Sequence, residues 1–301
     1  MRNNVLISGS SGFVGGNLIE YLNPYHNVSS ISLRFNPDEP VHLYGDVYIH
    51  LAGKAHDLKN VFQPQDYYNS NYNLTKEAYN AFLRSGLKKF IFISSVKAVA
   101  DHLDEPLTED FEARPTTHYG KSKLLAEQYI LNQVLPPGKS CFVLRPCMIH
   151  GPNNKGNLNL LHKLVSTGIP FPLAAFSNQR SFLSVENLCF IIKEILERDD
   201  IPSGVYNVAD DEPLSTNEVL KLLSQAQNKR LRLWHVPKPM IFSLARVGDV
   251  IKLPLNTERL QKLTENFIVS NEKIKSVLKK DLPLSSRDGI LKTARSLSSN
   301  E

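Results

Sequence analysis

The sequence has little of what a metalloprotein or a membrane-spanning protein needs. Its 301 residues include only three cysteines, Cys141, Cys147 and Cys189, an odd number without the spacing of a metal site. We expect these thiols to be buried and reduced, as in a cytoplasmic protein. His50 and His56 flank a predicted strand end, but no third ligand has a matching spacing, so we predict no metal site. No apolar run approaches the ~18 residues of a membrane-spanning helix, and we expect no signal peptide.

Charge of one sign is not concentrated in blocks either. The 35 lysines and arginines exceed the 30 aspartates and glutamates and are scattered along the chain, for a net charge of +5. A nucleic-acid-binding protein gathers basic residues on one face, so we predict no nucleic-acid partner, and we also predict no membrane partner. The mild basic excess suits a small anionic substrate. The hydrophobic content of 42% excludes a disordered chain, because it is sufficient for a large buried core.

Short apolar runs of strand length alternate with helical patterns through the first half of the chain. The predicted strands are 5–8, 28–33, 46–52, 90–94 and 141–145, and the predicted helices between them are 13–22, 72–84 and 119–135. Strands that are almost continuously apolar are typical of a parallel sheet with helices on both faces, joined by right-handed crossovers. We therefore predict an α/β fold with a doubly wound, parallel, Rossmann-like sheet and a smaller C-terminal substrate-binding lobe.

The pattern loosens after Pro146 into loops rich in glycine, proline and asparagine. We predict helices at 158–167, 188–197 and 216–227, a strand at 205–209, and a polar tail to the end of the chain. The expected NAD(P)-binding domain is 1–147, to which 182–210 returns. The expected substrate-binding lobe consists of 148–181 and 211–301.

Three glycines spaced three apart, Gly9, Gly12 and Gly15, follow the first predicted strand and begin the first helix. Glycine permits a tight turn and lets a pyrophosphate approach the helix N-terminus, where free N–H groups and the helix dipole attract an anion. Such turns also use glycine for steric reasons alone, but the strand before and the helix after are the right context. We therefore predict a dinucleotide-binding site here.

A tyrosine, a lysine and a serine form the candidate catalytic set. Tyr119 and Lys123 are four residues apart at the start of a predicted helix and so share one face. An ammonium near a phenol favours the phenolate, which should lower the pKa of Tyr119 from ~10 and make it a usable acid or base. Ser95 follows a predicted strand at the carboxyl edge of the sheet, where ligands of such sheets bind.

Taken in order along the chain, these motifs resemble those of the extended short-chain dehydrogenase/reductases, which include UDP-sugar 4-epimerases and nucleotide-sugar 4-ketoreductases. The resemblance covers nearly the whole chain and depends on the motifs Gly9-x-x-Gly12-x-x-Gly15, His50-Leu51-Ala52-Gly53, Asn71, Ser94-Ser95, Tyr119-Gly120-Lys121-Ser122-Lys123, Arg145-Pro146, Gly151-Pro152, Arg180-Ser-Phe-Leu-Ser-Val and Gly204-Val-Tyr-Asn-Val.

The resemblance assigns a role to each candidate residue. Tyr119 would be the catalytic acid/base, Lys123 its activator and a ribose contact, and Ser95 the hydrogen-bond partner of the substrate oxygen. Asn71 would hold the active-site helix and loop in place. The expected cofactor contacts are Gly9, Ser11, Gly12, Phe13, Val14, Gly15, Arg34, Leu51, Ala52, Gly53, Asn71, Tyr119 and Lys123.

Two reactions remain open after the dehydratases of this family are set aside. Those enzymes carry a Thr-Asp-Glu motif whose carboxyls move the protons of dehydration, whereas residues 95–98 here contain no carboxyl. Epimerisation at C4 and reduction of a 4-ketone both use the remaining groups. A catalytically silent member that senses NADP(H) or binds a partner is the alternative, although such members typically lose the tyrosine or the lysine.

The second predicted strand bears on cofactor choice. An acidic residue at its end would bind a ribose 2′-hydroxyl, but it ends in Arg34, which could pair with a 2′-phosphate. This favours NADP(H) over NAD(H), the alternative being a solvated arginine. Only eleven residues, 35–45, precede the next predicted strand, where the family normally has a helix and a strand. We predict that this connection is truncated and that the adenine pocket is more open than usual.

The resemblance also suggests the substrate. It implies a UDP-linked sugar, whose diphosphate the Arg180 fork would suit. Lys155-Gly156-Asn157 and Asn178-Gln-Arg180-Ser181 resemble enzymes of N-acetylamino-sugar pathways, which implies a sugar of that class. Dimerisation through the helices near Tyr72 and Tyr119 is a further expectation from the family. The expected substrate contacts are Lys97, Asn157, Phe171, Arg180 and Arg259.

Overall fold

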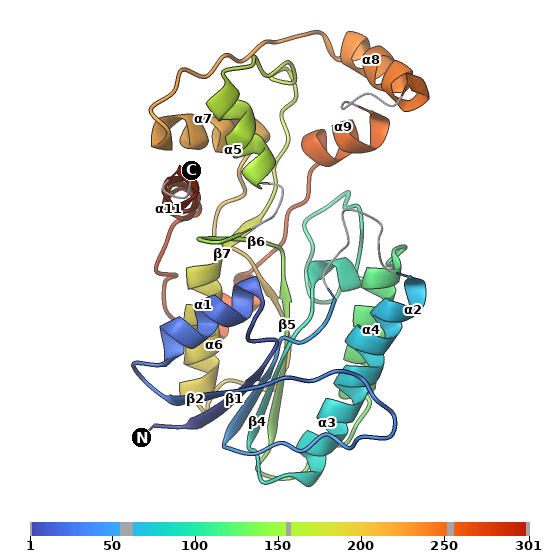
Figure 1. Cartoon of the computed structure of the whole chain (residues 1–301), viewed down its shortest axis with the longest axis vertical. Coiled ribbons are helices and arrows are strands. Elements are labelled where there is room, and N and C mark those ends of the chain that lie inside the picture. Colours follow the sequence, from blue (N-terminus) through green and yellow to red (C-terminus); the bar gives the residue numbers. More distant parts are fainter. Residues whose placement is uncertain (1, 55–62, 155–157, 252–255, 299–301) are drawn as a thin grey trace.

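A six-stranded parallel sheet is the centre of the molecule, and it confirms the predicted α/β, Rossmann-like fold (Figure 1). The structure is a computed structural model that describes residues 2–54, 63–154, 158–251 and 256–298. The strands lie in the order β2-β1-β3-β4-β5-β8. Their bounds are β1 Asn4–Ser8, β2 Asn27–Ile31, β3 Val47–His50, β4 Lys89–Ile93, β5 Ser140–Pro146 and β8 Gly204–Val208.

Helices cover both faces of the sheet, which explains why its strands are almost continuously apolar. The helices α1 (Phe13–Leu22) and α6 (Val185–Glu197) lie on one face, and α3 (Leu74–Arg84) and α4 (His118–Leu131) on the other (Figure 1). Alternate residues of a strand therefore enter different cores. Val5 packs in the core with residues of α1 and α6, whereas Leu6 packs in the core with residues of α3 and α4.

The connection between β2 and β3 is short, as predicted. No helix or strand is assigned between Ile31 and Val47, all of which the structure describes, so β2 is the edge strand. Leu33 and Leu43 of this segment pack against the core shared with α3 and α4. The segment therefore crosses β1 on that face, which is the side that a right-handed crossover from β2 to β3 requires.

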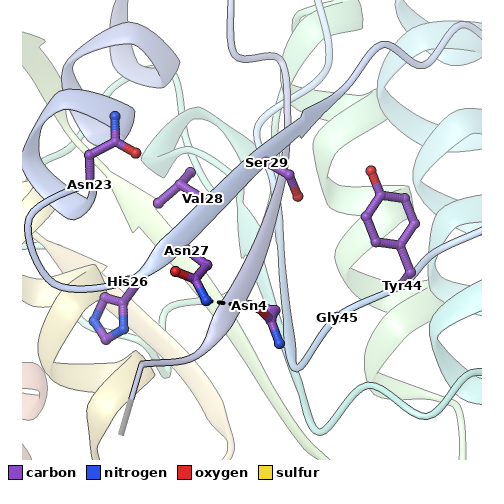
Figure 2. A pocket seen from close by; sticks show the side chains of 8 residues that line it. All are labelled: Asn4, Asn23, His26, Asn27, Val28, Ser29, Tyr44 and Gly45. Carbon is purple, nitrogen blue, oxygen red and sulfur yellow. Dashed lines mark hydrogen bonds between the residues drawn. The ribbon is translucent and has the colours of Figure 1, made fainter.

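A pocket of about 590 Å³ lies at the amino ends of β1 and β2 (Figure 2). Asn27 donates a hydrogen bond to the Asn4 side-chain oxygen across it, at 3.2 Å. Tyr44 and Gly45 of the short connection line its other side. Ligands of parallel sheets bind at the opposite, carboxyl ends of the strands, so this pocket is separate from the candidate site.

Most of the elements after β5 form a smaller lobe. They are the two-stranded sheet of β6 (Met148–His150) and β7 (Phe182–Ser184) and the helices α5 (Leu158–Thr167), α7 (Thr216–Ala226), α8 (Lys238–Ile251), α9 (Thr257–Thr264) and α11 (Ser286–Ser298). The short helix α10 (Glu272–Leu278) instead packs against β8.

The expectation of a polar tail after the helix at 216–227 is wrong, because α8 to α11 form there. Some of their apolar residues are buried: Ile274 and Leu278 of α10 lie in one core, and Ile290 and Ala294 of α11 in another. The predicted division into domains stays a prediction.

Candidate active site

The glycine turn leaves no room for side chains where it faces the next strand. Gly9 has a φ of +74°, and a Cβ atom there would lie 2.7 Å from the Ala52 nitrogen. A Cβ atom on Gly15 would lie 2.3 Å from the Gly9 carbonyl oxygen. Gly12 is the N-cap of α1 and makes no side-chain cap, so the first N–H groups of the helix stay available to an anion. These residues fit the pyrophosphate of a dinucleotide.

Gly15 and Gly16 make a matched pair for testing this turn, since both lie in α1. We expect Gly15→Ala to weaken dinucleotide binding at least about tenfold, because the methyl group would collide with the turn that holds the pyrophosphate. Gly16→Ala has no heavy atom within 4 Å of the added Cβ and should raise Tm slightly through helix propensity. Isothermal titration and thermal unfolding would measure both. Equal affinities for the two variants would contradict this account of the turn.

A buried histidine ties the glycine turn to the helices behind the site. His50 Nδ1 lies 2.8 Å from the Ser8 hydroxyl and 2.8 Å from the Tyr48 hydroxyl, and its Nε2 lies 3.0 Å from Thr75 Oγ1. Thr75 donates its own proton to the Asn71 carbonyl oxygen at 2.7 Å, so Nε2 carries the imidazole hydrogen. Burial lowers the pKa of His50 to about 3, which keeps the ring neutral.

Asn71 lies on a π-helix, a feature that the predicted helix 72–84 missed. The segment runs from α2 (Pro64–Tyr67) through the π-helical turn Tyr68–Asn73 into α3. The Asn71 side chain accepts a hydrogen bond from the Lys54 N–H at 2.8 Å and donates to the Ser122 hydroxyl at 3.1 Å. It therefore joins the loop after β3 to α4. π-Helical turns are frequent at functional sites, but nothing in the sequence pattern predicts this one.

Ser95, Tyr119 and Lys123 come together at the carboxyl ends of β4 and β5. The Ser95 side chain lies close enough to the Tyr119 phenol to favour its ionised form, and Tyr119 packs edge-on against Tyr67 with ring centroids 6.2 Å apart. Lys123 is buried, and its Nζ donates to the Ile93 carbonyl oxygen at 2.8 Å. α4 approaches this strand end closely, since a Cβ atom on Gly120 would lie 2.3 Å from the Lys97 carbonyl oxygen.

The prediction that Lys123 lowers the pKa of Tyr119 is wrong for this structure. Burial raises the pKa of the Tyr119 phenol, and the Ser95 side chain only partly opposes the rise. The Lys123 amine points to a backbone carbonyl and lies 4.8 Å above the Phe92 ring. Burial also lowers the pKa of Lys123 to about 8, against the opposing negative charge of Glu127.

This lysine should give the fold a measurable pH dependence. Its folded pKa of about 8 lies below its unfolded value of about 10.5, so between these pH values the unfolded chain binds more protons and stability rises with pH. Across this pH range, deprotonation of Lys123 should raise the free energy of unfolding by about 3 kcal/mol in total. Urea unfolding of wild type and Lys123→Met from pH 7.5 to 9.5 should show ~1 kcal/mol or more of extra stabilisation in the wild type. Parallel curves would contradict the assignment.

Beneath Lys123 lies a buried ion pair that was not predicted. Arg145 donates two hydrogen bonds from Nε and one from a terminal nitrogen to the Glu127 carboxylate, the shortest at 2.6 Å. Ser94 also donates to Glu127. Glu127 lies one helical turn after Lys123, and this four-residue spacing could have predicted that the two side chains are neighbours on α4. It could not have predicted the pairing with Arg145, which lies on β5.

The predicted substrate residues lie apart from one another along the chain, and the structure brings two of them together. Lys97 Nζ lies 4.3 Å from the centroid of the Phe267 ring, and the Arg180 guanidinium lies 5.9 Å from it. Arg180 also donates to the Lys262 carbonyl oxygen and lies 3.6 Å from Glu265. Phe267 and Glu265 were not predicted, because they stand alone in a stretch without a motif.

The other residues predicted to contact substrate or cofactor lie in different parts of the molecule. Phe171 is buried in the smaller lobe, and Arg259 lies in the first turn of α9. Arg34 is exposed just after β2. Asn157 lies outside the described residues. Within the described ranges, no three histidine, cysteine or acidic side chains are grouped to hold a metal, and no helix could cross a membrane.

The parallel sheet, the glycine turn and the Ser95–Tyr119–Lys123 arrangement define a short-chain dehydrogenase/reductase of the extended type. Residues 5–209 match the NAD dependent epimerase/dehydratase family, and the chain belongs to that family.

Two relatives show how far the similarity extends along the chain. The chain is 28% identical to UDP-glucose 4-epimerase of Vibrio cholerae, over 98% of this chain and 95% of the relative. It is 30% identical to N-acetyl-alpha-D-glucosaminyl-diphospho-ditrans,octacis-undecaprenol 4-epimerase of Escherichia coli O157:H7, over 80% of this chain and 77% of the relative.

Solved structures share the fold. RMD from Pseudomonas aeruginosa complexed with NADPH has a TM-score of 0.77 at 20% identity, covering 100% of this chain and 99% of that one. The enzyme WbmG of Bordetella bronchiseptica in complex with NAD and UDP has a TM-score of 0.75 at 16% identity, covering 99% of this chain and 95% of that one.

Proposed function

We propose that the protein is a 4-epimerase of a sugar linked through a diphosphate, with Tyr119 as the acid/base. The observation that carries the proposal is that Ser95, the Tyr119 phenol and the Lys123 amine meet at the carboxyl end of β4, with Lys123 one helical turn after Tyr119 along α4. The names of both relatives described above, each of them a 4-epimerase, support this reaction over the others of the family.

The chain's own groups would carry the proton at the sugar O4. Ser95 would hydrogen-bond that oxygen, and Tyr119 would take its proton when the C4 hydride leaves and return a proton when the hydride comes back to the other face. The nicotinamide, when bound, supplies the hydride acceptor and donor. The raised pKa of Tyr119 favours the neutral phenol, which is the form that protonates a 4-keto oxygen.

The diphosphate would lie near Lys97 and Arg180, which approach the same Phe267 ring. Glu265 is the acid beside Arg180, so an anionic substrate would have to compete with it. The carrier on the far side of the diphosphate would be a nucleotide or a polyprenol, the two kinds of carrier in the relatives' names. An N-acetylamino sugar is the proposed sugar class.

Reduction of a 4-ketone is the second candidate, and Arg34 favours it. Its exposed position after the edge strand β2 suits a ribose 2′-phosphate, hence NADPH, although the fold alone leaves this cofactor choice open. The catalytic groups would be the same, with a single proton transfer from Tyr119.

Two measurements test the proposal. Mass spectrometry of an acid extract would identify the retained dinucleotide, and chromatography would follow UDP-N-acetylglucosamine and its undecaprenol-linked counterpart. Retained NAD⁺ and formation of the C4 epimer without added reductant are expected. Consumption of NADPH with a 4-keto sugar would replace epimerisation by reduction. Absence of both dinucleotide binding and turnover would overturn the proposal in favour of a silent, partner-binding protein.

A further inference from the structure

The helix α8 exposes an apolar stripe that the fold leaves uncovered. Met240, Leu244, Val247 and Ile251 are each more than half exposed. At 100° per residue these four positions fall within about 60° of arc, so they form one continuous line along the helix. Isolated exposed apolar residues are common, but an aligned set of four is typical of an interaction surface.

The neighbouring side of α8 already fixes the helix to the protein. Ile241 and Ala245 are buried in the core of the smaller lobe together with Leu260 of α9. Asp249 of α8 also accepts hydrogen bonds from the backbone and the side chain of Thr257, where α9 begins. The exposed stripe is therefore not needed to hold the helix in place, and the anchored helix presents it outward.

Basic residues gather around this helix in the sequence. Residues 229–262 contain eight lysines and arginines and only two acidic residues, a net charge of +6, whereas the whole chain carries +5. The rest of the chain is thus close to neutral. The expectation that basic residues are merely scattered is wrong for this segment. Arg230 and Arg232 are exposed, as are Lys238 and Arg246 of α8 itself.

We propose that α8, together with the basic residues at 229–246, docks on an anionic lipid bilayer. An amphipathic helix of this kind lies in the membrane interface, with its apolar side chains among the acyl chains and basic residues near the anionic headgroups. Trp234, exposed four residues before α8, is of the type that favours this interface. The proposal goes against the expectation of no membrane partner, and it concerns surface docking, not a spanning helix.

The position of α8 links this surface to the candidate site. α8 lies at the end of the smaller lobe away from the sheet (Figure 1). It packs on α9, whose Lys262 carbonyl oxygen accepts a hydrogen bond from Arg180. Resting on the proposed function, this arrangement favours a polyprenol carrier, because the diphosphate would bind one helix away from the bilayer. The α3 and α4 helices, through which a dimer is expected, lie elsewhere and leave α8 free (Figure 1).

Flotation with lipid vesicles tests the docking surface directly. The full chain should bind vesicles of phosphatidylglycerol and phosphatidylcholine, and bind vesicles of phosphatidylcholine alone more weakly. The double variant Leu244→Gln/Val247→Gln should lose at least about tenfold in affinity, as should Arg230→Gln/Arg232→Gln at low salt. A matched control is Leu131→Gln/Val134→Gln, which changes two exposed apolar residues at the end of α4 and should bind as wild type.

The docking proposal would be overturned if wild type did not bind anionic vesicles, or if the Leu244→Gln/Val247→Gln variant bound them equally well. It would also be overturned if the protein formed an oligomer in solution that this variant dissociates, because a second copy would then cover the stripe. Thermal unfolding should give the same Tm for variant and wild type, as expected for surface positions. Epimerisation of a UDP-linked sugar without vesicles should be unchanged in the variant. Vesicle binding without any turnover would remove the proposed function and leave the docking surface standing.

Discussion

Replacing Tyr119 by phenylalanine should lower kcat by about a thousandfold, within the range that a positioned acid or base contributes. The change removes one oxygen from a half-buried ring that packs against Tyr67. Packing of the ring should survive, so the free energy of unfolding and the affinity for the dinucleotide should stay near wild type. Steady-state kinetics, urea unfolding and dinucleotide titration together separate loss of chemistry from loss of structure.

Tyr68→Phe is the matched control for this substitution. Tyr68 lies beside Tyr67, and its hydroxyl is 3.2 Å from His118 Nδ1, one residue before Tyr119. It is thus a nearby phenol outside the proposed reaction, and its loss should change kcat by less than about threefold, the effect of one exposed hydrogen bond. If Tyr119→Phe kept full turnover, or both variants lost it equally, Tyr119 would not be the acid/base.

The sheet could be predicted because each strand and helix carries its own local signal. The apolar run Val5 to Ser8, followed by a glycine turn and a helical pattern, predicts a strand, a turn and a helix in that order. The eleven-residue gap at 35–45 excludes an inserted helix and strand by length alone. The parallel pairing followed from those alternating elements.

Features that depend on contacts between distant segments could not be predicted in this way. The environment of Phe267 depends on Lys97 and Arg180, which are 170 and 87 residues away along the chain. The pKa of Tyr119 depends on burial and on where the Lys123 amine points, and a four-residue spacing does not determine either. The stripe on α8 was missed for the opposite reason: its spacing was visible, but only the structure separates its exposed positions from the buried Ile241 and Ala245.

The ion pair between Glu127 and Arg145 carries the largest expected effect on stability. Both side chains are buried, and one terminal nitrogen of Arg145 already lacks a hydrogen-bond partner among the described residues. Glu127→Gln would leave the guanidinium charge uncompensated, at a cost of about 3–5 kcal/mol in the free energy of unfolding. It would also remove the negative charge that raises the pKa of Lys123, so that this pKa should fall further below its ordinary value.

Urea unfolding of a small set of variants would separate this pair effect from a general loss of packing. Glu20→Gln, an exposed acid on α1, should change stability by less than about 0.5 kcal/mol. The double variant Glu127→Met/Arg145→Met should be more stable than Glu127→Gln, because replacing both charges by apolar side chains leaves no buried charge unpaired. A cost below about 1 kcal/mol for Glu127→Gln would contradict this account, because other groups would then have to stabilise the Arg145 charge.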